Sequence, residues 1–336
     1  MSNVRIITAD VRYGLAQLED ESVQCVVTSP PYWGLRDYGV DGQIGREATP
    51  EAFTQELVGI FAEVRRVLRA DGTLWLNLGD SYAQSSLDRT GGREGNRSTL
   101  GGGKETQRNA NRCVGNHGCK PKDLVGIPWR VAFALQADGW YLRSDIIWHK
   151  PNPMPESVTD RPTKAHEYIF LMAKSERYRY DADAIAEPSI HAGQTVVLGD
   201  KSLSRGQARG AGVAPSGNGS ASSVLVKDTR NARSVWTITT KSFKEAHFAT
   251  FPEQLAERCI KAGCPEGGTV LDPFGGAGTT GLVAAKLGRD AVLVELNPEY
   301  AAMARRRIED ALPLMVTVVA DKASTSAEQA ERAGGA

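Results

Sequence analysis

Short apolar runs alternate along most of the chain with segments whose apolar residues recur at helical spacing. The apolar runs predict strands at residues 4–7, 24–27, 73–77, 145–148, 168–173, 269–271 and 291–294. The helical spacing predicts helices at residues 50–68, 122–137, 252–262, 279–287 and 298–308. Strands that alternate with helices indicate an α/β fold with a doubly wound, mainly parallel sheet that is covered on both faces.

Two polar stretches interrupt this alternation. Residues 85–120 and 192–233 are rich in Gly, Ser, Asn and Arg and poor in apolar residues. Neither stretch can bury enough surface to offset the entropy lost on ordering, so we expect both to be flexible without a partner. We expect the end of the chain, residues 313–336, to be a largely disordered tail.

The composition is that of a soluble globular protein. The chain has 336 residues, of which 41% are hydrophobic, and its 40 Lys and Arg balance its 40 Asp and Glu. No apolar run approaches the roughly 20 residues that span a bilayer, and the first residues do not form a secretory signal. We therefore expect a cytoplasmic protein that does not bind membranes.

The five cysteines are irregularly spaced and predict no disulfide framework. Cys113, His117 and Cys119 follow the pattern C-x3-H-x-C, which is not a standard zinc spacing and has no fourth ligand nearby. We therefore favour the absence of a metal site.

Local charge says more about partners than the overall charge does. A net charge of zero argues against a uniformly basic nucleic-acid binder. Residues 82–130 and 191–247 nevertheless each carry five more Lys and Arg than Asp and Glu. Basic loops can also simply keep a surface soluble, and for either stretch taken alone we favour that interpretation.

The segment TVLDPFGGAGTTG, residues 269–281, has the pattern of a strand, a glycine-rich turn and the start of a helix. Residues 276–281 fit G-x-G-x-x-G, and Glu295 follows Gly276 by 19 positions, as in dinucleotide-binding loops. A Walker loop is excluded because no lysine precedes Thr279 or Thr280. The loop therefore predicts a cofactor that contains adenosine, either NAD(P) or S-adenosylmethionine.

Asp272, at the tip of the strand before this loop, helps to choose between the two cofactors. Its carboxylate would repel the pyrophosphate of NAD(P) at the start of the helix. The ammonium and sulfonium charges of S-adenosylmethionine would instead be attracted. We therefore favour S-adenosylmethionine, and an NAD(P)-dependent oxidoreductase is the distant alternative.

A second motif, TSPPYWG at residues 28–34, follows a predicted buried strand. Its prolines lack N–H donors and fix φ, so the loop presents carbonyl oxygens. Ser29 Oγ and the Pro30 carbonyl could accept hydrogen bonds from an amino group, and Tyr32 or Trp33 could stack on a base taken out of a duplex. A Pro-Pro turn capped by an aromatic residue is also common, so this motif alone is weak evidence.

Together, TSPPYWG and DPFGGAGTTG resemble motifs of the DNA amino-methyltransferases, which methylate N4 of cytosine or N6 of adenine. The segments 71–81, 145–157, 166–175 and 247–263 resemble further blocks of that family. The catalytic motif precedes the glycine loop, as in the circularly permuted group called beta. This resemblance covers most of the chain outside the polar stretches and the tail. It implies a Rossmann-like, S-adenosylmethionine-dependent methyltransferase fold.

The resemblance also implies an organisation of the chain. Residues 1–180 would form the catalytic half of one domain, with a flexible insert at 85–120, and residues 242–312 would form its cofactor-binding half. Residues 181–241 between them would be a target-recognition insert. The remaining segment, residues 313–336, would be the tail.

Individual residues acquire roles through the same resemblance. The catalytic residues would be Ser29, Pro30, Pro31 and Tyr32, and the base pocket would be bordered by Trp33, Trp148, His149, Lys150 and Asn152. S-adenosylmethionine would be bound by Asp272, Phe274, Gly276, Gly278, Thr279, Thr280, Glu295, His247, Phe251, Pro252 and Asp10. The candidate DNA contacts are Arg205, Arg209, Arg230 and Arg233, and a solvated position is an equal alternative for each of these arginines.

The implied reaction is direct methyl transfer from S-adenosylmethionine to the exocyclic amine of a flipped base in double-stranded DNA. In the family, S-P-P-Y usually accompanies cytosine N4, so cytosine is favoured and adenine N6 is the alternative. C5 methylation is rejected because no cysteine lies in a Pro-Cys loop beside a glycine motif. The partners would be DNA and a cognate restriction endonuclease, and the protein would be a monomer or homodimer.

Overall fold

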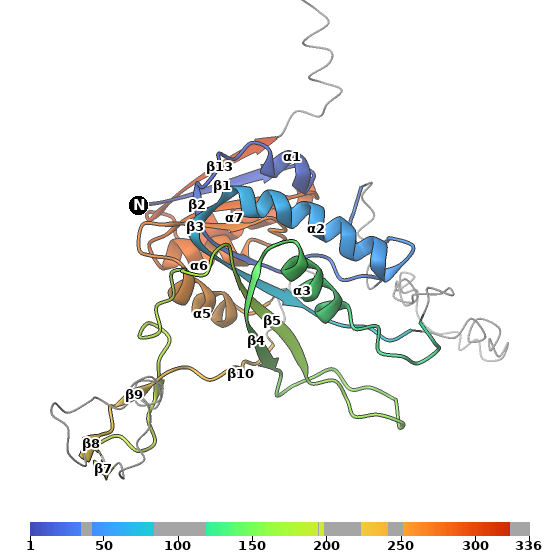
Figure 1. Cartoon of the computed structure of the whole chain (residues 1–336). Helices are drawn as coiled ribbons and strands as arrows, with labels where there is room; N and C mark the ends of the chain where they lie inside the picture. Colours follow the sequence, from blue (N-terminus) through green and yellow to red (C-terminus); the bar gives the residue numbers. More distant parts are fainter. Residues whose placement is uncertain (35–41, 84–118, 194, 198–222, 241–250, 323–336) are drawn as a thin grey trace, which may run out of the picture.

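The computed structural model describes residues 1–34, 42–83, 119–193, 195–197, 223–240 and 251–322. In these ranges, nine strands form one sheet in the order β10-β4-β5-β3-β2-β11-β12-β1-β13 (Figure 1). Neighbouring strands are parallel except around β5, which is antiparallel to β3 and β4. The predicted doubly wound, mainly parallel sheet is thus confirmed. The strands are β1 (Ser2–Thr8), β2 (Val23–Thr28), β3 (Leu68–Leu78), β4 (Tyr141–His149), β5 (His166–Ala173), β10 (Val235–Thr237), β11 (Thr269–Asp272), β12 (Asp290–Glu295) and β13 (Val316–Lys322).

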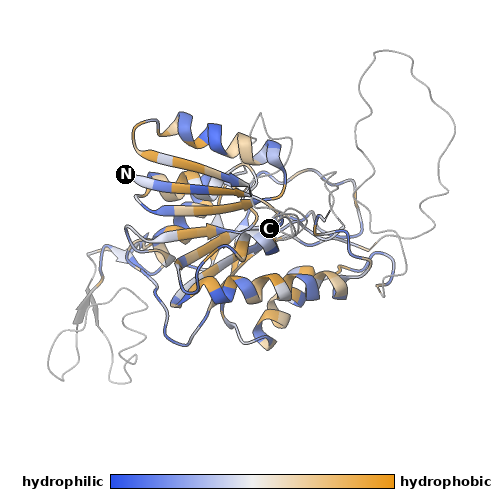
Figure 2. Cartoon of the chain, turned by 90° about the horizontal axis from the view of Figure 1, so that it is seen from above, coloured by the Kyte–Doolittle hydropathy of each residue, from blue (hydrophilic) through white to orange (hydrophobic). Residues whose placement is uncertain are grey.

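Helices cover both faces of this sheet. One face carries α1 (Val11–Leu15), α2 (Pro50–Val67) and α3 (Ile127–Ala137), and the other carries α5 (Glu253–Gly263), α6 (Thr279–Lys286) and α7 (Pro298–Ala311). On β2, Cys25 and Val27 pack in the core beneath α5–α7, whereas Val26 packs in the core beneath α1–α3. Figure 2 shows apolar residues along the central strands and mixed positions on the helices. Burial on both faces explains why these strands appear in the sequence as continuous apolar runs.

Helix α2 illustrates how local sequence determines these elements. Thr49 caps the helix, because its hydroxyl accepts a hydrogen bond from the Ala52 amide at 3.1 Å, and Pro50 occupies the first turn. The side chains that recur on one face are fully or almost fully buried: Phe53, Leu57, Ile60, Phe61 and Val64. The predicted helix at residues 50–68 is therefore confirmed to within one residue. None of the helices in the described ranges is both long and apolar enough to cross a membrane.

The order of the strands creates a switch point between β2 and β11. These strands are parallel neighbours, with Cys25 opposite Val270 and Val26 opposite Leu271. From β2 the chain continues through α2 to β3 on one side, and from β11 it continues through α6 to β12 on the other side. The loops after β2 and β11 therefore leave the sheet in opposite directions. A crevice between such loops is where open α/β sheets bind ligands.

Two short antiparallel ladders lie outside the main sheet, and both fall in the expected insert at residues 181–241. Strand β6 (Glu187–Pro188) pairs with β9 (Thr229–Arg230), and β7 (Thr195–Val197) pairs with β8 (Ser223–Leu225). Figure 1 shows β7, β8 and β9 projecting away from the main sheet.

The predicted helix at residues 122–137 is wrong over its first turn, because α3 begins only at Ile127. Lys122 and Gly126 have φ values of +71° and +77°, which are incompatible with a continuing right-handed helix. Gly126 instead caps α3, and the amide of Val125 donates to the Ser81 carbonyl at 3.0 Å. This connection holds the start of α3 next to the segment that follows β3.

Two strands of the main sheet were not predicted, β10 and β13. Strand β13 pairs in parallel with β1 along its whole length, so the expectation of a disordered tail is wrong for residues 316–322. Residues 323–336 lie outside the described residues. Strand β10 pairs with β4 and places the buried Trp236 against Trp75, so the end of the expected insert belongs to the main sheet. Both strands are at sheet edges, where half-exposed residues replace the apolar runs of central strands.

The pairing of β13 with β1 generates a prediction about stability. Ending the chain after Leu312 removes β13 and exposes the edge of β1, whereas ending it after Lys322 leaves the sheet intact. We expect the shorter variant to unfold several degrees below the full chain, since large domains lose about 2–4 °C per kcal/mol. The longer variant should unfold at the temperature of the full chain. Calorimetry of all three proteins checks this, and three equal midpoints would contradict the structural role of β13.

Candidate active site

A buried carboxylate joins the loops that follow β2 and β11. Asp272, the last residue of β11, is 1% exposed. Its Oδ1 accepts hydrogen bonds from Thr28 Oγ1 at 2.7 Å and from the Phe274 amide at 3.1 Å. Its Oδ2 accepts one from Thr280 Oγ1 at 2.7 Å. Because Thr28 directly precedes Ser29, Asp272 ties the Ser-Pro-Pro-Tyr loop to the glycine loop.

The hydrogen bonds around Asp272 suit a neutral acid as well as a carboxylate. Burial raises the pKa of Asp272 to about 6, although the hydrogen bonds from Thr28, Thr280 and Phe274 oppose this shift. Thr280 Oγ1, which has one hydrogen, lies 2.7 Å from Asp272 Oδ2 and 3.2 Å from the Val27 carbonyl oxygen. A proton on Oδ2 can be donated to Thr280, which then donates its own proton to Val27, so every group has a partner. The predicted contact of Asp272 with the cofactor stays a prediction.

The glycine loop bends sharply between β11 and α6. Gly276 and Gly278 have φ values of +49° and +76°, which favour glycine. A Cβ atom at Gly278 would lie 2.7 Å from the Cβ of Ala304 on α7, so no side chain fits there. Gly278 also caps α6, whose first residues, Thr279 and Thr280, are buried. The loop thus presents bare backbone at the mouth of the crevice.

Glu295, at the end of β12, faces this loop. Its Oε2 accepts a hydrogen bond from the Gly276 amide at 2.7 Å, and its Oε1 accepts one from the Asn297 amide at 2.8 Å. Burial raises the pKa of Glu295, and these two backbone hydrogen bonds oppose the shift. Because each carboxylate oxygen has two lone pairs, both oxygens can accept one more hydrogen bond. A pair of neighbouring hydroxyl groups, as on a ribose, would match this arrangement.

Arg307 on α7 holds the glycine loop from behind. Its Nη1 donates to the Ala277 carbonyl oxygen at 3.1 Å and to Thr279 Oγ1 at 2.9 Å, and its Nη2 pairs with Glu253 at 3.1 Å. The sequence suggested that the arginines at 305–307 form a solvated face, and for Arg307 this is wrong. A single basic run on a helix does not reveal which of its members turns inward.

The other residues predicted to bind the cofactor are spread around the same edge of the sheet. Asp10 follows β1, the neighbour of β12, where it caps α1 and pairs with Arg12 at 2.8 Å. Phe274 and Phe251 are partly buried against opposite cores, and Pro252 is buried at the start of α5. His247 lies outside the described residues, so its predicted role is untested.

These residues fit S-adenosylmethionine better than a cofactor with a diphosphate. A diphosphate would need the Gly276 amide as a donor, but this amide donates to Glu295. The Glu295 carboxylate would also repel a diphosphate at the loop. Hydroxyl groups and positive charge are compatible with both observations.

The Ser-Pro-Pro-Tyr loop lies over the end of β3. The ring of Tyr32 packs on Gly79, where a Cβ atom would lie 2.4 Å from Tyr32 Cε2. The Tyr32 hydroxyl donates to Glu167 Oε2 at 2.8 Å and lies 3.4 Å from Ser29 Oγ. Pro30 is buried and Pro31 is partly buried. The structure thus brings the predicted catalytic residues together and adds Glu167 and Gly79, which were not predicted.

Trp33 is not a base-pocket residue, and this prediction is wrong. Its side chain is 3% exposed and belongs to the core beneath α1–α3. Its Nε1 donates to the Glu47 carbonyl oxygen at 2.9 Å. An aromatic side chain after a Pro-Pro turn can face the core or the crevice, and here only Tyr32 remains at the crevice.

The predicted block from Trp148 to Asn152 is mainly structural. Trp148 is buried and its Nε1 donates to the Ile238 carbonyl oxygen, so a place on the base pocket is wrong for this residue. His149 lies 3.1 Å from Thr237 Oγ1, and Asn152 exchanges two hydrogen bonds with the backbone of Thr240. These contacts fasten β10 and the segment after it to β4. Lys150 differs, because it forms an ion pair with Glu167 and thereby reaches the Tyr32 network.

Two of the four predicted DNA-contacting arginines lie in the described residues. Arg233 pairs with Glu187 at 2.8 Å, and Arg230 lies 3.6 Å from the same carboxylate oxygen. Burial would raise the pKa of Glu187, but these arginines hold it below its ordinary value. Arg205 and Arg209 lie outside the described residues. A role in DNA contact stays a prediction for all four.

The described cysteines are poorly suited to act as nucleophiles. Cys25, Cys259 and Cys264 are buried, and burial raises the pKa of each thiol, that of Cys264 to about 11. A thiolate is therefore disfavoured at these positions. Cys119 is partly buried, while Cys113 and His117 lie outside the described residues, so no test of a metal site is possible there.

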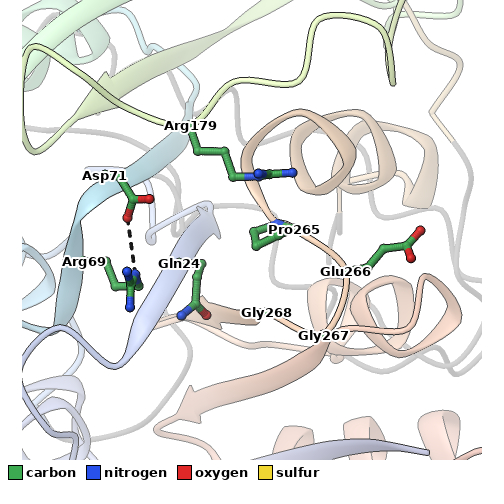
Figure 3. A pocket seen from close by; sticks show the side chains of 8 residues that line it. All are labelled: Gln24, Arg69, Asp71, Arg179, Pro265, Glu266, Gly267 and Gly268. Atoms are coloured by element: carbon green, nitrogen blue, oxygen red, sulfur yellow. Dashed lines mark hydrogen bonds and ion pairs between the residues drawn. The ribbon is translucent and has the colours of Figure 1, made fainter.

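A cavity of about 300 Å³ lies at the opposite edge of the sheet (Figure 3). It is lined by residues at the amino ends of β2, β3 and β11, among them Gln24, Arg69 and Gly268. Arg69 and Asp71 form an ion pair of 3.3 Å across its wall. In open α/β sheets the ligands bind at the carboxyl ends of the strands, so this cavity is not the site that the motifs predict.

Comparisons with known proteins agree with this site. The model of the N6_N4_Mtase family, described as DNA methylase, matches residues 23–306. The Type II methyltransferase M.SmaI of Serratia marcescens is 45% identical over 313 residues, which cover 92% of this chain and 91% of that protein. The Type II methyltransferase M.XycI of Xanthomonas campestris pv. cyanopsidis is 48% identical over 300 residues, covering 88% and 84%. A solved structure of a DNA modification methylase from Thermus thermophilus, complexed with S-adenosyl-L-methionine, is 26% identical and covers 94% of this chain and 99% of that chain, with a TM-score of 0.55.

The raised pKa of Asp272 predicts a pH-dependent stability. The folded protein holds this proton up to about pH 6, whereas the unfolded chain releases it near the ordinary value of 3.8. The contribution of Asp272 to stability is therefore fully present below pH 4 and is lost as the pH rises through 6. Asp272→Asn resembles the neutral acid at every pH. We expect its free energy of unfolding, relative to the wild type, to increase by up to roughly 3 kcal/mol between pH 4 and pH 7.

Urea denaturation of both proteins across this pH range measures the difference. Other titrating groups cancel, because they are the same in the two proteins. Parallel pH curves would show that Asp272 does not hold a proton in the folded state in this range.

Proposed function

The chain belongs to the N6_N4_Mtase family of DNA methylases, and from this premise we propose that it methylates N4 of a cytosine in double-stranded DNA with S-adenosylmethionine as the donor. The observation that carries this proposal is the hydrogen bond between Thr28 and Asp272, which holds the two motif loops at one crevice. The glycine loop would hold the donor on one side of this bond. The Ser-Pro-Pro-Tyr loop would hold the target base on the other side.

The choice of cytosine rests on Ser29. In the resembling family, serine at the first position of the tetrapeptide usually accompanies cytosine N4, and aspartate usually accompanies adenine N6. A hydroxyl and a carbonyl oxygen can serve as acceptors for either amine, so adenine N6 methylation by the same mechanism is the alternative that the experiment must separate.

The residues around the glycine loop would bind the donor. Glu295 would accept hydrogen bonds from the ribose hydroxyls, and Gly276 and Gly278 would allow close approach to the backbone. Arg307 would keep the loop in this conformation. When bound, S-adenosylmethionine supplies an electrophilic methyl group on a positively charged sulfur.

The Ser-Pro-Pro-Tyr loop would orient the base. The lone pair of an exocyclic amine is delocalised into the ring, which makes the amine a poor nucleophile. Hydrogen bonds from the amine to Ser29 Oγ and the Pro30 carbonyl would favour rehybridisation and direct the lone pair toward the methyl group. Tyr32 would stack on the extruded base. Most of the rate would come from this alignment, and the methylated amine would then lose its proton without a strong general base.

The partners follow from the same reasoning. The similar proteins M.SmaI and M.XycI are Type II methyltransferases, and we infer that this protein protects DNA from a cognate restriction endonuclease. The segment between β5 and β10 would contact the recognition sequence, with Arg230 and Arg233 as candidate contacts. The enzyme would act as a monomer or homodimer.

Expression in a methylation-free host, followed by single-molecule sequencing of the host DNA, tests the proposed reaction. We expect N4-methylcytosine in one sequence context. Replacing Ser29 with alanine removes one acceptor of the amine and should lower the methyl-transfer rate on the order of 10- to 1,000-fold.

N6-methyladenine in the same readout would contradict the choice of cytosine but not the mechanism. Unmodified DNA, together with binding of labelled NAD(P) rather than labelled S-adenosylmethionine, would contradict methyl transfer and support the oxidoreductase alternative. Binding of DNA with no transfer from S-adenosylmethionine would indicate a non-catalytic DNA-binding protein.

A further inference from the structure

We propose that Glu167 is a positioning residue for methyl transfer, because through Tyr32 it turns the Ser29 hydroxyl into a hydrogen-bond acceptor for the target amine. This inference rests on the proposed function. It concerns a carboxylate that the motifs do not identify and that directly precedes the predicted strand at residues 168–173.

Glu167 is held firmly at the carboxyl edge of the sheet. It is the second residue of β5, where it lies opposite Trp148 of β4. Its Oε1 pairs with the ammonium group of Lys150, and the side chains of both residues are less than 20% exposed. Lys150 itself lies over the ring of Trp148, with its Nζ 4.3 Å from the ring centre. The pair is thus anchored on β4 and β5 and directs Oε2 toward the Ser-Pro-Pro-Tyr loop.

Two donors converge on Oε2 of Glu167. The Tyr32 hydroxyl lies at 2.8 Å and the Asn77 side-chain amide at 3.2 Å. Asn77 also donates to the Tyr168 carbonyl oxygen at 3.1 Å, so both of its amide hydrogens face acceptors and its orientation is fixed. Its Oδ1 lies 3.3 Å from the Tyr32 hydroxyl, farther than Glu167 does. The single hydrogen of Tyr32 therefore goes to the carboxylate, which is the nearer and the charged acceptor.

The direction of this hydrogen bond determines the direction of the next one. Because Tyr32 gives its hydrogen to Glu167, its oxygen is left to accept. Ser29 Oγ lies 3.4 Å from that oxygen and donates to it. This contact is long, as catalytic hydrogen bonds often are before the substrate binds. With its hydrogen directed at Tyr32, Ser29 offers lone pairs to the crevice.

This arrangement matters because Ser29 is neutral. A carboxylate at this position can only accept hydrogen bonds, whereas a hydroxyl can also donate. A hydroxyl that donated to the amine would occupy the lone pair that must attack the methyl group. The chain from Ser29 through Tyr32 to Glu167 prevents this orientation. It also places a negative charge at its end, and hydrogen bonds that point the same way along a chain strengthen one another.

The test uses three variants of the full-length enzyme in a steady-state methylation assay. Glu167→Gln removes the charge at the end of the chain, and Tyr32→Phe removes the link but keeps the ring. Each should lower kcat on the order of 10- to 100-fold, the effect of losing a hydrogen bond to a charged group, with unchanged KM for DNA and for S-adenosylmethionine. The double variant should be no slower than the slower single variant, because both changes break one chain.

Glu176→Gln is the matched control. It makes the same change of charge just beyond the other end of β5, at an exposed residue, and should leave kcat unchanged. Thermal unfolding of every variant separates a folding defect from a catalytic one. Tyr32→Phe preserves the ion pair between Lys150 and Glu167, so it tests the chain even where Glu167→Gln fails to fold.

Rescue by aspartate distinguishes this chain from a merely structural role. An aspartate at position 29 accepts hydrogen bonds without assistance, so it should not depend on Glu167. In a Ser29→Asp background, Glu167→Gln should therefore lower kcat much less than it does beside Ser29. An equal loss in both backgrounds would overturn the proposal, and so would additive losses in the double variant or a wild-type kcat for Glu167→Gln. An inactive wild-type enzyme in the same assay would instead contradict the proposed function.

Discussion

The hydrogen bond from Thr28 to Asp272 is the contact on which the site depends. It joins the carboxyl ends of two parallel strands that are 244 positions apart in the chain, and it does so inside the protein, where neither group has access to water. A buried carboxylate without partners would be costly, so Thr28, Thr280 and the Phe274 amide must all stay in place. The positions of both motif loops follow from this one requirement.

Much of the fold and half of the site could be predicted from the sequence because their signals are local. The central strands are buried on both faces and therefore appear as apolar runs, and Gly276, Gly278 and Glu295 belong to one strand-turn-helix-strand unit of fixed spacing. The edge strands β10 and β13 were missed because their residues are only partly buried. Trp33 and Trp148 were assigned to the crevice although both belong to the core, since an aromatic residue beside a motif has the same appearance in either place.

Glu167 could not be recognised from the sequence for a different physical reason. Its partners Tyr32 and Asn77 lie 135 and 90 positions away, and they meet it only because β5 runs antiparallel to β3 and returns the chain to the carboxyl edge. The same holds for Arg307, whose contacts with Ala277 and Thr279 depend on how α7 packs against the glycine loop. Local spacing identifies the loops of such a site, and tertiary pairing identifies the residues that orient them.

The central claim is that both loops serve one reaction centre, with the donor on one side of the Thr28–Asp272 bond and the base on the other. A crystal structure of the enzyme with S-adenosylhomocysteine and a duplex that contains its recognition sequence tests this most directly. The account predicts an extruded base whose amino nitrogen lies within hydrogen-bonding distance of Ser29 Oγ and the Pro30 carbonyl oxygen. It also predicts that the ribose hydroxyls donate to Glu295 at the end of β12. A target base that stays in the duplex, or a nucleoside bound away from β12, would contradict it.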